Sequence, residues 1–216
     1  MIKRILQAAV LCAALVLIPA AFNLAALRAP HLWVLLGFGI LASLLQPPYN
    51  PFAIAVKPGD KGTGAMIVWF VYATQIAAVL EAVYLRFPQS LVWDAVSTGA
   101  AAAMLVGLGI RTWAVATLGG LFTMHLDIRP DHRIVERGPY RWVRHPSYLG
   151  AFIMYVATAL MLHAWFSAGA AALLLPVAFA RRIRHEETML RQAFGADYDA
   201  YCGRVRKIIP GLRVRA

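Results

Sequence analysis

The stretch AMIVWFVYATQIAAVLEAVY, residues 65–84, decides the fold class, because Glu81 is its only charged residue. An α-helix rises about 1.5 Å per residue, so roughly 20 apolar residues cross the hydrocarbon core of a bilayer, which is about 30 Å thick. This stretch therefore predicts a transmembrane helix.

The rest of the chain repeats this pattern. Of the 216 residues, 61% are hydrophobic and only 14% are charged, well below the roughly 25% usual in soluble domains. The sequence predicts an all-α polytopic membrane protein with five or six transmembrane helices, the number staying open because three of the segments are short. The five further segments are Ile5 to Leu27, Leu32 to Gln46, Leu91 to Leu118, Tyr148 to Leu162 and Trp165 to Ala180.

Positive charges orient these segments. Lys and Arg accumulate in cytoplasmic loops, and here five arginines lie between Asp127 and His145 while nine Lys or Arg residues follow Ala180. The connections expected on the opposite side hold only Arg28 and Arg86. Six crossings with both termini in the cytoplasm satisfy every loop, and they bring the basic connection and the basic tail to the same face of a membrane, expected to be a prokaryotic inner membrane.

The charge and cysteine content exclude other classes of partner. A formal charge of +11 would suggest nucleic acid for a soluble protein, but beside apolar segments it fits anionic lipid headgroups instead. Cys12 and Cys202 lie too far apart in sequence to indicate a disulfide framework or a cysteine metal centre. The sequence thus predicts membrane lipid as a partner, with no metal, no nucleic acid and no obligate protein partner.

Charged residues within the apolar segments are few. Glu81 and Asp94 stand near predicted helix ends, where they are expected to reach the membrane interface. Arg111 lies deeper in its segment and is interpreted as a place where that helix leaves the lipid.

Polar residues gather in two stretches, His125 to Tyr148 and Arg181 to Tyr201. In the first, Gly138-Pro139-Tyr140 is a turn signal, and the proline of Arg144-His145-Pro146-Ser147-Tyr148 suits the start of a helix, whose amino end favours an anion. In the second, Arg182 and Glu186 are four residues apart and share a helix face. Spacing alone favours a surface ion pair for this pair and a structural hydrogen bond for His145.

The ordered combination of these elements resembles the isoprenylcysteine carboxyl methyltransferase family, including its prokaryotic relatives, with phospholipid methyltransferases as more distant kin. The likeness covers about Met124 to Leu212, which divides the chain into an N-terminal membrane region, 1–123, and a methyltransferase-like region, 124–216, with a helical hairpin and a basic tail. The matching elements are His132-Arg133-Ile134-Val135, Gly138-Pro139-Tyr140, Arg144 to Gly150, Glu186-Glu187, Phe194-Gly195, Tyr198, Tyr201 and Ile209-Pro210.

The resemblance implies an S-adenosylmethionine-dependent methyltransferase with a cytoplasmic cofactor pocket. It assigns catalytic roles to Arg182, Glu186 and His145, with Glu186 closing the pocket and Arg182 contacting a lipophilic acceptor. The chain has no Gly-rich loop of the soluble nucleotide-binding type, so a different scaffold must hold the cofactor. By similarity the cofactor-binding residues are His125, His132, Arg133, Ile134, Val135, Tyr140, His145, Pro146, Ser147, Tyr148 and Glu186.

The acceptor stays open at the level of sequence. A protein-borne prenylcysteine fits the family name, while a phospholipid or another small amphiphile fits the distant kin. A carboxylate acceptor needs no general base, whereas an amine or thiol would need His145 or Glu186 to remove a proton. Two further alternatives are a non-catalytic membrane protein or transporter, and a membrane reductase of the sterol type that uses NADPH.

Overall fold

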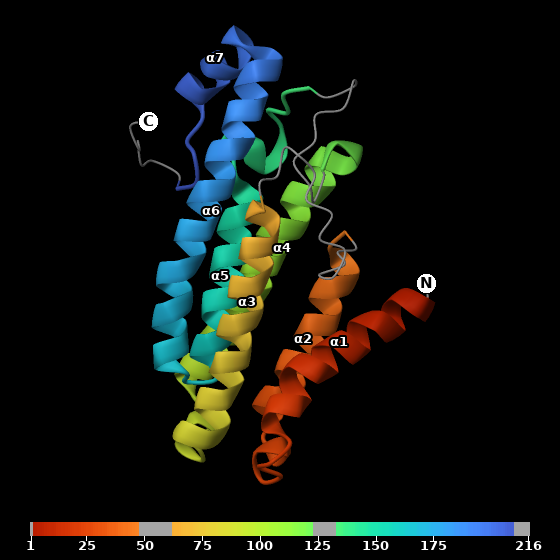
Figure 1. The fold of residues 1–216 in the computed structure, drawn as a ribbon, viewed down its shortest axis with the longest axis vertical. Coiled ribbons are helices and arrows are strands. Elements are labelled where there is room, and N and C mark those ends of the chain that lie inside the picture. The colour runs from red at the N-terminus through yellow and green to blue at the C-terminus, as the bar shows by residue number, and fades with distance from the viewer. Residues whose placement is uncertain (1, 48–61, 123–132, 210–216) are drawn as a thin grey trace.

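The computed structural model describes residues 2–47, 62–122 and 133–209, and within them the chain is all-helical (Figure 1). Six apolar helices are followed by one short polar helix. Between the described segments the only β pairing is an isolated parallel bridge of Val143 with Arg206. The helices are α1 (Ile2–Ala20), α2 (Pro30–Leu45), α3 (Thr63–Leu80), α4 (Ala95–Leu118), α5 (Pro146–Met161), α6 (Trp165–Phe194) and α7 (Ala196–Arg204).

Each predicted apolar segment forms a helix, which confirms the fold class. Three helical stretches are long and apolar enough to cross a membrane, namely Thr63–Leu85, Ala95–Leu121 and Trp165–Phe194. Three shorter apolar helices accompany them, Ile5–Ala20, Pro30–Leu45 and Pro146–Met161.

Two boundaries differ from the expectation. The first helix ends at Ala20, not near Leu27, and short turns lead into α2. The last apolar helix continues well beyond Ala180 to Phe194, because the polar sequence RRIRHEETMLRQAF contains no glycine or proline and is rich in strong helix formers. Gly195, at φ +51°, then ends the helix.

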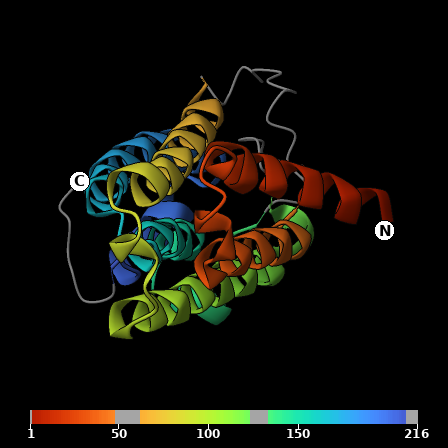
Figure 2. The same ribbon diagram turned by 90° about the horizontal axis from the view of Figure 1, so that it is seen from below.

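The helices pack as a four-helix core with a hairpin against it. Helix α4 makes its most extensive contact with α5, and α3 makes its own with α6, while α1 packs on α2 and touches α3 (Figures 1 and 2). In Figure 1, α1 diverges from the core toward its N-terminus. The hairpin is therefore joined to the core mainly at the end remote from α7.

Buried polar groups connect the helices at that remote end. Glu81 is only 3% exposed and accepts hydrogen bonds from the backbone N–H groups of Phe166 and Ser167 at 3.1 and 2.8 Å, which caps the start of α6. The expectation that Glu81 reaches the interface is therefore wrong. Asp94, whose side chain is 46% exposed, caps α4 by accepting from the Ser97 N–H at 2.9 Å, and its position at the end of an apolar helix agrees with the expectation.

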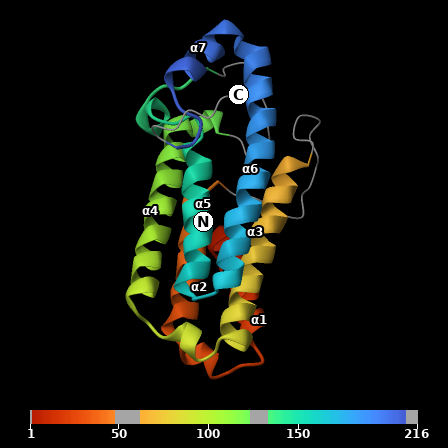
Figure 3. The ribbon, with the colours of Figure 1, turned by 90° about the vertical axis from the view of Figure 1, so that its left-hand side faces the viewer.

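The opposite end of the molecule is polar. The extension of α6, the short α7 and the turn Gly138–Arg141 gather there beside the start of α5 (Figure 3). This end is called the polar end below. It brings residues 133–148 of the first polar stretch beside the second, as their charges predict.

Candidate functional site

A cavity of about 200 Å³ lies at the polar end, between α3, α4, α5, α6 and α7. Its wall combines tyrosines, arginines and a carboxylate with apolar side chains of the helix bundle, such as Ile67, Val68 and Phe179. The lining residues used below are Arg111, Arg133, Ile134, Val135, Tyr140, Arg144, His145, Ser147, Tyr148, Tyr155, Arg182, Glu186, Tyr198 and Tyr201.

The hydroxyl of Tyr148 connects the two residues predicted to form a surface ion pair. It donates to Oε2 of Glu186 at 3.0 Å and accepts from Nε of Arg182 at 3.2 Å. Arg182 is 4% exposed and also donates to Oγ1 of Thr63 at 3.2 Å. The surface interpretation of Arg182 and Glu186 is therefore wrong, because the arginine is buried among helices α3, α5 and α6.

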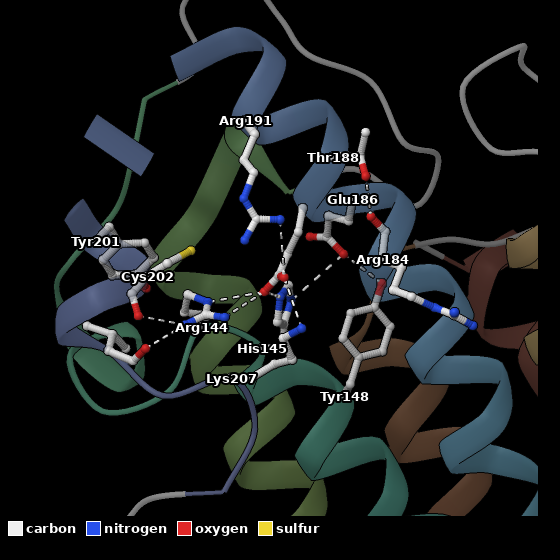
Figure 4. Close-up of polar contacts among 12 residues, drawn as sticks. Arg144, His145, Tyr148, Arg184, Glu186, Thr188, Arg191, Tyr201, Cys202 and Lys207 are labelled. Atoms are coloured by element: carbon white, nitrogen blue, oxygen red, sulfur yellow. Dashed lines mark hydrogen bonds and ion pairs between the residues drawn. The ribbon is translucent and has the colours of Figure 1, made fainter. Parts of the chain in front are cut away.

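Glu187, which the sequence names only as part of the Glu186-Glu187 motif and without a role, is the centre of a charged network. Figure 4 shows Arg144, Arg191 and Lys207 converging beside His145. Glu187 is 2% exposed, and its Oε1 accepts from Arg144 at 2.9 and 3.1 Å. Its Oε2 lies 3.1 Å from Nζ of Lys207 and 3.8 Å from a guanidinium nitrogen of Arg191. Three cations surround one buried carboxylate, which keeps its charge compensated.

His145 lies between the two glutamates. Its Nε2 is 3.2 Å from Oε1 of Glu187, and its Nδ1 is 3.9 Å from Oε2 of Glu186. Since the Glu187 carboxylate accepts, Nε2 carries the proton of this hydrogen bond and the ring is fixed in one orientation. The other ring nitrogen faces the carboxylate that lines the cavity.

The C-terminal segment is fastened to the start of α5 by backbone and side-chain bonds. The N–H groups of Arg144 and His145 donate to the carbonyls of Arg206 and Lys207 at 2.7 and 3.0 Å. Arg144 also donates to the carbonyl of Val205 at 2.6 Å. The tail thus holds the segment that carries His145 in place.

Tyrosines complete the wall beside this segment. The hydroxyl of Tyr201 donates to the carbonyl of Tyr140 at 2.9 Å. Burial, reinforced by the negative charge of Glu186, raises the pKa of the Tyr140 phenol, and burial also raises the pKa of Tyr201. Both phenols therefore stay neutral and can donate hydrogen bonds at any physiological pH.

Most of the predicted site residues meet in this cavity. Pro146 is the exception among the described ones, since it occupies the first turn of α5, is buried and does not line the cavity. His125 and His132 lie outside the described residues. Those that line it are Arg133, Ile134, Val135, Tyr140, His145, Ser147, Tyr148, Arg182 and Glu186.

Similarity to known proteins identifies the family of this chain. The model of the "Isoprenylcysteine carboxyl methyltransferase (ICMT) family" matches residues 100–192, which run from α4 to α6. A probable protein-S-isoprenylcysteine O-methyltransferase of Oryza sativa subsp. indica is 36% identical over 128 residues, covering 58% of this chain and 67% of the rice protein. The chain belongs to the isoprenylcysteine carboxyl methyltransferase family.

More distant members of this family match a larger part of the chain. A protein-S-isoprenylcysteine O-methyltransferase of Tribolium castaneum is 29% identical over 212 residues, covering 86% of this chain and 75% of its own. The solved structure of a eukaryotic intramembrane Ras methyltransferase of the family superposes with a TM-score of 0.57 at 22% identity, covering 83% of this chain and 77% of that one. The latter shows a shared fold. The protein is accordingly an integral membrane methyltransferase, which sets aside the transporter and reductase alternatives.

Helix geometry explains why the sequence assigns Glu187 no role of its own. Successive helical residues point about 100° apart, since a helix has 3.6 residues per turn. Glu186 and Glu187 therefore leave α6 in different directions, one into the cavity and one toward Arg144. An adjacent Glu-Glu pair predicts only that the two side chains point in different directions, and the contacts of Glu187 with Arg144 and Lys207 show which member is enclosed.

Proposed function

We propose that this chain transfers the methyl group of S-adenosylmethionine to the carboxylate of a prenylated cysteine at the cytoplasmic face of a prokaryotic inner membrane. The observation that carries the proposal is the cavity in which His145, Tyr148, Arg182 and Glu186 converge at the end of an apolar helix bundle. The names of the relatives supply the acceptor class, and the clustering of basic residues supplies the orientation.

The described residues fit this cofactor. S-adenosylmethionine supplies an electrophilic methyl group on a positively charged sulfonium. The carboxylate of Glu186 and the rings of Tyr140 and Tyr148 would hold such a cation, and Arg133 would pair with the amino-acid carboxylate. The wall of the cavity thus combines groups of both signs, as a zwitterionic ligand requires.

The protein's own contribution is positioning. A carboxylate acceptor is already a nucleophile, so no side chain has to remove a proton from it. Arg182, buried and oriented by Tyr148 and Thr63, would anchor the acceptor carboxylate with a charge-assisted hydrogen bond. Glu187 would fix His145 so that its Nδ1 keeps facing Glu186.

Calorimetric titration of the detergent-purified protein with S-adenosylhomocysteine tests the cofactor assignment. We expect binding by the unchanged protein and its loss in Glu186→Ala, because that change removes the carboxylate from the cavity. The matched control is Glu136→Ala, whose exposed side chain pairs only with Arg204 among the described residues. Absence of binding in the unchanged protein, or equal binding by both variants, would contradict the proposal.

Transfer of a radiolabelled methyl group into a native membrane extract tests the acceptor. We expect base-labile label in prenylated protein, as a carboxyl methyl ester requires. Label in phospholipid would instead support the distant kin and overturn the prenylcysteine assignment.

A further inference from the structure

A second cavity, of about 370 Å³, lies between the α1–α2 hairpin and helices α3 and α5. This volume falls within the roughly 300–1,000 Å³ typical of ligand pockets. Four residues line both cavities, so the two spaces adjoin inside the protein. They are Ile67, Val68, Arg111 and Tyr155.

The second cavity has a mainly apolar wall that also carries neutral polar side chains, among them Gln7, Ser43, Gln46, Gln75 and Thr158. Arg111 is the one charged residue among the described residues that line it. The cavity therefore combines space for a hydrocarbon with a single cation, placed where it meets the polar cavity.

The guanidinium of Arg111 is only partly used by the protein. One terminal nitrogen donates to Oγ and to the carbonyl of Ser147 at 2.8 and 3.2 Å, both neutral acceptors. Throughout residues 2–47, 62–122 and 133–209, no carboxylate pairs with it and its other N–H groups have no acceptor. An arginine has five N–H donors, so most of the donor capacity of Arg111, which lines both cavities, is unused by the described residues.

Without a ligand, an arginine placed in this way raises the free energy of the folded protein. Arg111 lies seven residues before the end of α4, so it stands about 10 Å inside the helix. A charged side chain at membrane depth costs free energy and usually marks a functional site. A fork of donors in a confined, apolar setting is well suited to a carboxylate, which it can bind in a bidentate manner.

We propose, on the basis of the function proposed above, that Arg111 binds the carboxylate of the acceptor while the prenyl chain occupies the cavity walled by the α1–α2 hairpin. Arg111 is then a second acceptor-binding arginine beside Arg182. It lies where the second cavity, which holds the prenyl chain, meets the cavity at the polar end. An acceptor must present both an anion and a hydrocarbon chain to occupy this junction.

Steady-state kinetics with N-acetyl-S-farnesylcysteine and S-adenosylmethionine test the role of Arg111. We expect Arg111→Gln to raise the KM for the farnesylcysteine about tenfold to a hundredfold, as loss of a charge-assisted hydrogen bond implies, with the KM for the cofactor within about twofold. Arg111→Lys, which keeps the charge, should recover part of the affinity. Arg181→Gln, at an exposed position on α6, is the matched control and should behave like the unchanged protein.

A binding measurement separates this inference from the proposed function. The amide of the same farnesylcysteine is neutral and cannot be methylated on a carboxylate. The unchanged protein should bind the acid more tightly than the amide, and Arg111→Gln should reduce this difference, the remainder coming from Arg182, while still binding S-adenosylhomocysteine. If the unchanged protein does not methylate the farnesylcysteine, the proposed function fails. If it does, but Arg111→Gln weakens the cofactor alone or leaves acid and amide as distinct as before, only the inference fails.

A bulky substitution in the second cavity tests whether the prenyl chain binds there. Ala42→Phe places a ring in the second cavity and should raise the KM for the farnesylcysteine, whereas Leu41→Phe, on an exposed position of the same helix, should not. Equal kinetics of the two variants would contradict the assignment of the prenyl chain to this space.

Discussion

At the scale of single residues, two adjacent glutamates have different surroundings. Glu186 lines the cavity and accepts from Tyr148, whereas Glu187 is enclosed by Arg144, His145 and Lys207. The first is placed to contact a ligand, and the second stabilises the segment that carries the ligand-facing residues. A change at Glu186 should therefore impair ligand binding directly, whereas a change at Glu187 should destabilise the segment that carries the ligand-facing residues.

Glu187→Gln should lower the melting temperature of the detergent-solubilised protein and weaken the binding of S-adenosylhomocysteine. The amide no longer compensates Arg144 and Lys207, and breaking a buried ion pair costs about 3–5 kcal/mol. Glu136→Gln, which alters an exposed pair with Arg204, should change stability by less than about 1 kcal/mol. Thermal denaturation and calorimetry measure both effects, and equal melting temperatures for the two variants would refute the structural role of Glu187.

At the scale of elements, the contact of α4 with α5 positions the site. Arg111 on α4 reaches Ser147 at the start of α5 because the two backbones pass very close to each other. A Cβ built on Gly107 would lie 2.7 Å from the carbonyl oxygen of Gly150, and one built on Gly150 would lie 2.5 Å from that of Gly107. The two glycines therefore set the helix spacing, as small residues commonly do between membrane helices.

Gly107→Ala should force these helices apart, destabilise the protein by about 1–3 kcal/mol and raise the KM for the farnesylcysteine, because Arg111 shifts relative to Ser147. Gly109→Ala on the same helix meets nothing within 4 Å and should be neutral or slightly stabilising, since alanine favours helix. Melting temperature and KM for the farnesylcysteine measure the comparison. A Gly107→Ala protein as stable and active as Gly109→Ala would show that the close approach is unimportant.

At the scale of the whole molecule, the bundle has two unlike ends. Helix α7 and the extension of α6 lie at the polar end (Figures 1 and 3). This end also carries the cavity and the fastened tail, whereas the remote end is joined by buried groups such as Glu81. If the polar end faces the cytoplasm, water-soluble cofactor reaches the site from one side and a lipid-borne acceptor reaches it from within the membrane.

Cysteine labelling in membrane vesicles tests this orientation. In a background in which Cys12 and Cys202 are replaced by serine, Arg184→Cys at the polar end should react with a membrane-impermeant maleimide only in inside-out vesicles. Gln89→Cys, exposed at the remote end, should react only in right-side-out vesicles. Labelling of both positions from the same side would contradict an odd number of crossings between them.

The sequence by itself determined the helices, because length and apolarity suffice for a segment to form a helix in lipid, and each predicted segment is one. The charge pattern also predicted that the two polar stretches share one face, and the resemblance to the family predicted that His145, Tyr148, Arg182 and Glu186 share one site; all four line one cavity. Only the tertiary structure decided that Arg182 is buried, that Glu187 holds the network together and that Arg111 joins two cavities. Those properties depend on which helices lie side by side and at what spacing, and periodicity within one segment carries no information about its neighbours.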